Sequence, residues 1–323
     1  MKDFTPSEMK TILHSKRANL YYLQHCRVLV NGGRVEYVTD QGKESLYWNI
    51  PIANTTAILL GTGTSVTQAA MRELAKAGVL VGFCGGGGSP LFTGNEVDVE
   101  VSWLTPQSEY RPTEYLQKWV SFWFDDAKRL TAAKHFQRVR LAMIKKHWLA
   151  ASTQQQFPVP ETQLTSVLAR FERLLTDCET TQDLLLLEAT TTKTLYKLAS
   201  QAVDYGDFTR SERGNSNDVA NQFLDHGNYL AYGLGATACW VIGLPHGLAI
   251  LHGKTRRGGL VFDVADIVKD ALVLPQAFIA AMAGDDEQEF RQRCLNQLRA
   301  GNALDVMIET LQDTAERCAE ITQ

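Results

Sequence analysis

The hydrophobic pattern changes its period about one third of the way along the chain. From Asn19 to about Trp103, short apolar runs alternate with turn residues, which is typical of β-strands. Beyond Pro112, apolar residues recur at helical spacing almost to the end of the chain. The two patterns meet at the proline-bearing segment TPQSEYRP. The pattern therefore predicts an α+β protein, with a small N-terminal β-rich domain (residues 1–105) followed by a larger all-α domain (residues 106–323).

Composition narrows the class of protein. The formal charge of −4 gives no overall attraction to nucleic acid, so any such binding must come from local clusters of basic residues. The six cysteines form no C-x-x-C pair, which is typical of reduced thiols in a cytoplasm. The polar start MKDFTPSEMK lacks the apolar core of a signal peptide, and no run of apolar residues is long enough for a membrane span. We therefore expect a soluble, cytoplasmic protein without membrane contact.

Glu188 lies in a helical run, residues 183–202, on the same face as apolar residues. Leu184, Leu195 and Ala202 lie at offsets of four, seven and fourteen from it, all near multiples of the helical period. An ionised carboxylate on a core-facing stripe is costly unless it is paired or bound to a metal. Glu188 is therefore expected to have a specific partner.

The stretch HGKTRRGGLVFDVADIVKD, residues 252–270, combines a histidine, a basic cluster and three acids. Its pattern predicts a helix that begins at Asp263, with Asp263, Asp266 and Asp270 on roughly one face. An imidazole and clustered carboxylates suit a hard divalent metal, either Mg²⁺ or Mn²⁺. The alternative is structural, because Asp263 and Asp266 also resemble a capping pair at a helix N-terminus.

Two clusters of basic residues are candidates for phosphate binding. The first follows the histidine directly and comprises Lys254, Arg256 and Arg257. The second lies in a stretch without any acidic residue, 127–160, and comprises Lys134, Arg138 and Lys145, which share one helical face. Such a stripe can follow a DNA backbone, although a run of charges can also be a solvated helix face.

Together these segments resemble the CRISPR-associated spacer-acquisition integrases, the "Cas one" proteins, and most closely their type I-F branch. The family's E-(G/A) step on a helix matches Glu188-Ala189, and its D-P-x-N-x-x-L segment matches residues 218–224 without the proline. Its L-x-Y-G-like element matches residues 230–233. The family's histidine-glycine turn and the acidic segment after it are matched by His252, Leu260, Asp263 and Asp266. Order and spacing agree along the whole chain, which is more specific than any single motif.

The resemblance implies a site and an activity. Its metal ligands would be Glu188, His252 and Asp266, with Asp263 as an auxiliary carboxylate and Tyr232 close to the active site. In the implied reaction, the 3′-hydroxyl of a captured DNA fragment attacks a phosphodiester at the edge of a CRISPR repeat, and the reverse reaction cleaves branched DNA. The implied assembly is a homodimer, formed through the N-terminal domain, on double-stranded DNA. Its partner would be the "Cas two" protein, which type I-F systems fuse to the "Cas three" nuclease-helicase.

Two other classes of function remain open from the residues alone. A non-catalytic DNA-binding scaffold would use the acids only to cap helices, and substitution of Glu188 would then cost no activity. A metal-dependent hydrolase acting on small molecules predicts a closed pocket and no basic stripe. For the metal site, the clustered acids Glu188, Asp263 and Asp266 are expected to repel one another in a partly desolvated pocket when no metal is bound.

Overall fold

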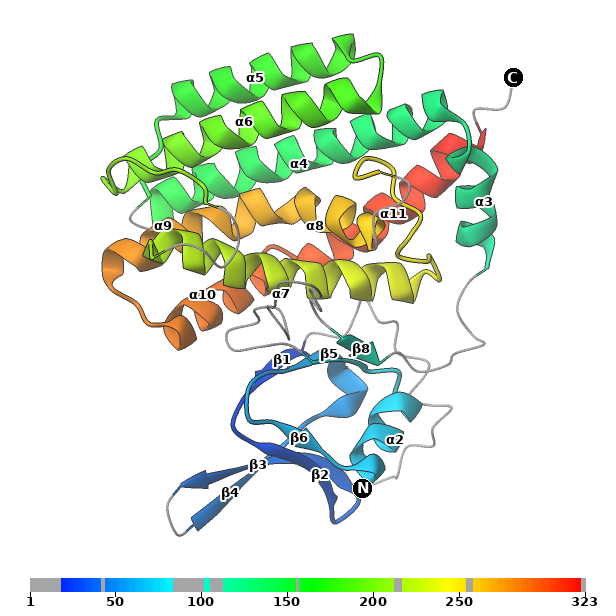
Figure 1. Ribbon diagram of the computed structural model, residues 1–323, viewed down its shortest axis with the longest axis vertical. Helices are drawn as coiled ribbons and strands as arrows, with labels where there is room; N and C mark the ends of the chain where they lie inside the picture. Colours follow the sequence, from blue (N-terminus) through cyan, green and yellow to red (C-terminus); the bar gives the residue numbers. More distant parts are fainter. Residues whose placement is uncertain are drawn as a thin grey trace. The chain divides into compact units, whose positions relative to one another are not determined.

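The computed structural model describes seven stretches of the chain, and these fall into two compact units. The stretches are residues 19–41, 44–83, 102–104, 113–154, 157–211, 217–253 and 258–320. The basic cluster Lys254, Arg256 and Arg257 lies outside the described residues. The units span residues 1–110 and 111–323, and the described parts of the first hold the strands while those of the second are helical (Figure 1). The predicted α+β class, β-rich first and helical second, is therefore confirmed.

The N-terminal unit contains two four-stranded sheets. The strands are β1 (Asn19–Leu23), β2 (Arg27–Asn31), β3 (Arg34–Gln41), β4 (Glu44–Asn49), β5 (Thr55–Leu60), β6 (Ser65–Val66), β7 (Leu80–Phe83) and β8 (Ser102–Leu104). In the first sheet, of order β1-β5-β7-β8, three parallel strands are followed by the antiparallel β8. In the second sheet, of order β4-β3-β2-β6, the strands β2, β3 and β4 are antiparallel neighbours and β6 runs parallel to β2.

Local sequence explains why the N-terminal unit forms. All six residues of β5, TTAILL, are buried, as expected for a strand covered on both faces. Gly32 and Gly33 join β2 to β3 with φ values of 54° and 77°, which glycine adopts at little cost. Helix α2 (Gln68–Lys76) begins after Thr67, whose side chain accepts a hydrogen bond from an amide of the first turn. Strands and helix together enclose one hydrophobic core, which includes Val28, Val35, Ile58, Leu74 and Val81.

The C-terminal unit is a helical bundle (Figure 1). Its helices are α3 (Glu114–Trp123), α4 (Asp126–Gln154), α5 (Glu161–Asp177), α6 (Thr181–Ala202), α7 (Val219–Val241), α8 (Gly259–Leu272), α9 (Leu274–Ala283), α10 (Glu287–Ala300) and α11 (Ala303–Glu320). Helices α4, α5 and α6 pack on one another, and α8 packs against α4 and α7. No helix among the described residues is long and apolar enough to cross a membrane.

Helix α8 forms the centre of this bundle. Every residue of α8 except Lys269 is buried. Close approach of α7 depends on Gly235, because a Cβ atom there would lie only 2.8 Å from the Val261 carbonyl oxygen. The three aspartates of α8 are thus in a core, where each carboxylate needs hydrogen bonds or a cation.

The predicted start of this helix at Asp263 is wrong. Helix α8 begins four residues earlier, at Gly259, because Gly258 adopts a left-handed conformation with φ 67° and turns the chain into the helix. The amide of Leu260 in the first turn donates to the His246 carbonyl. This backbone contact, and not a capping aspartate, satisfies the Leu260 amide. Asp263 therefore lies inside the helix, and its carboxylate is free to bind groups outside α8.

Candidate functional site

Asp263 organises the turn that carries His252. Its Oδ2 accepts hydrogen bonds from the amides of Ile250 (2.7 Å) and Leu251 (3.2 Å). Its Oδ1 accepts from the amide of His252 (3.0 Å) and from the imidazole Nδ1 of the same residue (2.6 Å). Three backbone donors and one ring nitrogen thus converge on one carboxylate that is only 3% exposed. Asp263 is engaged in holding the turn, in keeping with the auxiliary role that the resemblance implies.

Two tryptophans of α3 anchor the same turn from another side. The indole nitrogen of Trp119 donates to the Leu248 carbonyl at 3.1 Å, and that of Trp123 donates to the Ala249 carbonyl at 2.7 Å. Both bonds lie within four residues of His252. The position of the imidazole is therefore determined by two helices, α3 and α8.

The contact with Asp263 decides which nitrogen of His252 is presented to the site. A carboxylate only accepts hydrogen bonds, so Nδ1 carries the proton and Nε2 faces Asp266, whose Oδ2 is 3.7 Å away. Burial lowers the pKa of His252, but the hydrogen bond with Asp263 and the charges of Asp266 and Asp263 outweigh burial and raise the pKa above its ordinary value. When the ring is neutral, Nε2 offers a lone pair toward Asp266.

Asp266 is buried and only partly satisfied. Its Oδ1 forms an ion pair with Nζ of Lys269 at 2.5 Å. Its Oδ2 is buried and has no hydrogen-bond partner among the described residues. Unpartnered buried carboxylate oxygens are rare, and an absent ion is one explanation for them. An imidazole nitrogen and this oxygen face each other, so they could serve as two ligands of one cation.

Glu188 has the specific partner that its position on an apolar stripe predicts. Its side chain is 13% exposed, and Oε1 lies 3.2 Å from Nη1 of Arg140 on α4. The same oxygen accepts a hydrogen bond from the hydroxyl of Thr192 at 3.1 Å. Arg140 also pairs with Asp270 of α8. Arg140, which sequence reasoning did not select, is therefore the group that joins the acids of two helices.

A sequence signal for Arg140 exists in hindsight. Buried residues flank it at helical spacing: Ala133 lies seven positions before it, Phe136 four positions before it and Ile144 four positions after it. Arg140 thus lies on the apolar stripe of α4 and is itself only 2% exposed. A buried arginine on such a stripe requires carboxylate partners, just as Glu188 requires a cation.

The expectation that the acids repel one another without metal is wrong for this arrangement. Arg140 and Lys269 supply two positive charges among the buried acids. Burial opposes the charge on Lys269, yet Asp266 and three further groups, Tyr232, Asp270 and Glu188, hold its pKa well above the ordinary value. The ring of Tyr232 packs edge-on against the ring of Phe262, with 4.8 Å between the ring centroids. This contact places Tyr232 beside the cluster.

Two cations link Glu188 electrostatically to Asp266, the residue that faces His252. Arg140 and Lys269 each interact electrostatically with both Glu188 and Asp266. Within the described stretches, however, no three His, Cys, Asp or Glu side chains gather as a ready set of metal ligands, and Oε1 of Glu188 faces Arg140. The ligand set Glu188, His252 and Asp266 stays a prediction.

The second basic cluster lies along the contact between α4 and α5. Lys134 donates from Nζ to the Thr176 carbonyl at 3.0 Å, and Arg138 pairs with Glu172 at 2.9 Å. Lys145 is exposed on the same helix. Two of the three cations thus already have partners in α5, and their proposed contact with DNA stays a prediction.

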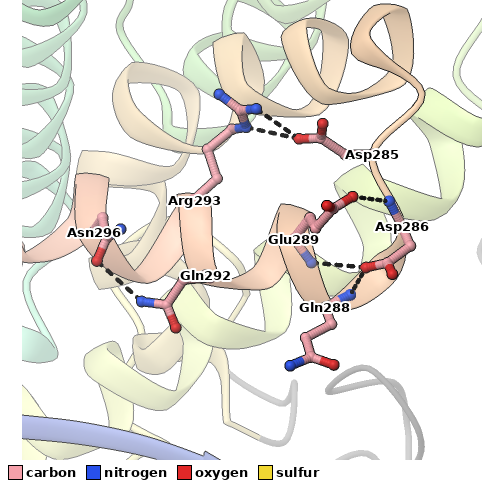
Figure 2. Close-up of a pocket in the computed structure, with 7 residues that line it drawn as sticks. All are labelled: Asp285, Asp286, Gln288, Glu289, Gln292, Arg293 and Asn296. Atoms are coloured by element: carbon pink, nitrogen blue, oxygen red, sulfur yellow. Dashed lines mark hydrogen bonds and ion pairs between the residues drawn. The ribbon is translucent and has the colours of Figure 1, made fainter.

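A surface hollow near the start of α10 belongs to a different part of the bundle. It is lined by Asp285, Asp286, Gln288, Glu289, Gln292, Arg293 and Asn296 (Figure 2). Its charged groups serve one another, because Arg293 binds Asp285 at 2.7 Å and Asp286 with Glu289 forms a reciprocal cap on α10. None of the predicted site residues that the structure describes lines this hollow.

A family model described as "CRISPR associated protein Cas1" matches residues 20–290. The chain belongs to this family. A relative from Pectobacterium atrosepticum, named "CRISPR-associated endonuclease Cas1", is 67% identical over 322 residues, which cover 99% of this chain and 99% of that protein. The resemblance to "Cas one" proteins is therefore confirmed, whereas the type I-F assignment stays a prediction.

Two solved structures share the fold of this Cas1 protein. A casposase bound to integration product aligns with a TM-score of 0.71 at 15% identity, covering 94% of this chain and 91% of that chain. A chain of the Cas6-RT-Cas1–Cas2 complex aligns with a TM-score of 0.66 at 12% identity, covering 94% of this chain and 35% of that chain. At such low identity the likeness concerns the fold alone, and it agrees with a β-rich unit followed by a helical bundle.

Proposed function

We propose that this Cas1 protein is a metal-dependent DNA integrase and endonuclease. The observation that carries the proposal is that the buried Oδ2 of Asp266, which has no hydrogen-bond partner among the described residues, faces Nε2 of His252. Arg140 contacts Glu188 in the same cluster, and Lys269 interacts electrostatically with it. The name of the Pectobacterium relative supports nuclease activity, and the casposase structure joins a similar fold to an integration product. In the proposed reaction, a 3′-hydroxyl of a captured DNA fragment attacks a phosphodiester of a CRISPR repeat, and the reverse reaction cleaves branched DNA.

The residues that would hold Mg²⁺ or Mn²⁺ are Glu188, His252 and Asp266. When bound, such a metal supplies activation of the attacking hydroxyl and stabilisation of the leaving oxygen. Asp263 fixes the imidazole so that Nε2, and not Nδ1, faces the site. One phosphodiester replaces another in this exchange, so the chain needs no site for an external energy source.

The proposed assembly follows from the same family. We infer a homodimer formed through the N-terminal unit, in the cytoplasm, with a Cas2 partner that a type I-F system would fuse to the "Cas three" nuclease-helicase. Exposed aromatic side chains on the edge strand β4, Tyr47 (55%) and Trp48 (49%), support an interface there. The solved Cas6-RT-Cas1–Cas2 complex supports a Cas2 partner.

The direct test is a joining assay with labelled double-stranded DNA, a plasmid that carries the repeat, and the purified Cas2 partner. Joined product is expected with Mn²⁺ or Mg²⁺ and is expected to disappear when the metal is chelated. A branched DNA substrate tests the reverse reaction under the same conditions. If DNA is bound but neither joined nor cleaved with any metal, the protein is a scaffold and not an enzyme.

Replacing Lys134, Arg138 and Lys145 together by alanine is expected to weaken DNA binding in a salt-dependent manner. Each phosphate contact that is lost should reduce the slope of log affinity against log salt by up to about 0.9, because fewer counterions are released. The matched control removes two exposed cations elsewhere in the bundle, Arg299 and Arg317. An unchanged slope in the triple variant would show that these cations only bind α5 and solvent.

A further inference from the structure

Arg140 occupies the junction of three helices. It lies on α4, against which both α6 and α8 pack, and its side chain is 2% exposed. All three guanidinium nitrogens are engaged. Nε donates to Oδ2 of Asp270 at 2.9 Å. Nη1 donates to Gln137 at 2.9 Å and lies 3.2 Å from Oε1 of Glu188. Nη2 donates to the Thr192 hydroxyl at 2.7 Å and also to Asp270.

Charge neutrality alone does not account for this set of contacts. Asp270 binds two nitrogens of the guanidinium and is sufficient to balance its charge. Apart from the bond of Nη1 to Gln137, the remaining contacts converge on one atom, Oε1 of Glu188. Nη1 approaches this oxygen directly, while Nη2 reaches it through the Thr192 hydroxyl, which accepts from Arg140 and donates to Glu188 at 3.1 Å.

These two contacts select one oxygen of a flexible side chain. Among the described residues, the hydrogen-bond and ion-pair contacts of Glu188 all fall on Oε1. A glutamate has several rotatable bonds, and holding one of its oxygens leaves the lone pairs of Oε2 in a defined direction. Outer partners of this kind orient metal ligands in proteins, and their loss weakens metal affinity by about 10–100-fold.

We propose that Arg140 is a positioning residue, which acts with the Thr192 hydroxyl to hold Glu188 in the orientation needed for metal binding. This inference rests on the proposed function, because it takes Glu188 as a ligand. Arg140 itself touches neither metal nor DNA. Its planar fork spans Asp270, Glu188 and Thr192 at once, which the single ammonium of a lysine cannot do.

The test uses substitutions that leave the net charge unchanged, because a neutral residue at position 140 would also relieve repulsion of the metal. Thr192→Val removes only the hydroxyl link, and Arg140→Lys keeps the charge without the fork. Thr194→Val is the matched control on α6, since among the described residues that hydroxyl binds its own helix alone, at the Thr190 carbonyl. Thr192→Ser restores the hydroxyl and should rescue binding.

The measurement is calorimetric titration of the full-length chain with Mn²⁺, alongside chemical unfolding of each metal-free variant. We expect Thr192→Val and Arg140→Lys to raise the Kd for Mn²⁺ by about 10–100-fold. Thr194→Val and Thr192→Ser should bind Mn²⁺ as the parent does. Should Arg140→Lys fail to fold, the comparison of valine with serine at position 192 still tests the hydroxyl link from Arg140 to Glu188, and an unchanged Kd in both would refute the proposal.

The possible failures are distinguishable. If Thr192→Val and Arg140→Lys both bind Mn²⁺ as tightly as the parent while Glu188→Gln loses binding, the metal site stands and the positioning role of Arg140 is refuted. Lower stability with an unchanged Kd would have the same meaning, because a purely structural role moves only the first quantity. If the parent does not bind Mn²⁺, or Glu188→Gln binds it equally well, the proposed metal site itself is wrong.

Discussion

Replacing Asp263 by alanine is expected to lower the free energy of unfolding of the helical unit by about 3–5 kcal/mol, the usual loss when one partner of a buried charged pair is removed. Three backbone amides and the ring of His252 would lose their acceptor inside the protein. An unsatisfied buried donor costs more than the bond itself contributes. DNA joining should also fall, because the imidazole would lose the contact that orients it. Denaturant unfolding and the joining assay measure the two effects.

Asp266→Ala is the matched control, three residues further along the same helix. Asp266 accepts no backbone hydrogen bond in the described residues, and its cation Lys269 is 17% exposed and can reach water. We therefore expect a smaller loss of stability but a larger loss of joining than for Asp263→Ala. Equal losses of stability in the two variants would contradict the separate roles assigned to these aspartates.

The fold could be predicted where its cause is local. The change from alternating to helical hydrophobic period is visible within short windows, so the β-rich and helical units could be recognised without any tertiary information. The start of α8 could not, because it depends on a left-handed Gly258 and on a contact between Leu260 and His246 that forms only in the folded chain. An aspartate near a helix start resembles a cap whether or not it serves as one.

The site could likewise be predicted only as far as its causes are local in sequence. The need of Glu188 for a partner follows from its position on an apolar stripe, but the identity of that partner does not. Arg140 belongs to another helix, and its own partner Asp270 to a third. The sequence-based expectation of repulsion counted the acids of two segments but no buried cation, whereas packing of α4 against α6 and α8 brings in the balancing charge of Arg140.

Substitution of Glu188 is expected to remove DNA joining and metal-induced stabilisation together. With Mn²⁺ at a concentration a hundredfold above its Kd, the parent protein should gain about 2.7 kcal/mol of stability by mass action. Glu188→Gln should gain much less, because an uncharged amide is a poor ligand for a hard cation. The joined product should fall to background in the same variant, while binding of DNA without metal should remain.

The metal-free stability of two variants separates a ligand from a structural carboxylate. Glutamine at position 188 retains an oxygen that can accept hydrogen bonds from Arg140 and Thr192, so Glu188→Gln should have a free energy of unfolding close to that of the parent. Glu188→Ala leaves a buried donor unsatisfied, so its free energy of unfolding should be lower. Glu172→Gln on α5, which removes the exposed partner of Arg138, is the control and should match the parent in metal-free unfolding and in the stability gained from Mn²⁺. A Glu188→Gln protein that still gains full stability from Mn²⁺ would falsify the assignment of this glutamate as a ligand. Glu188 would then serve only to balance the buried charge of Arg140.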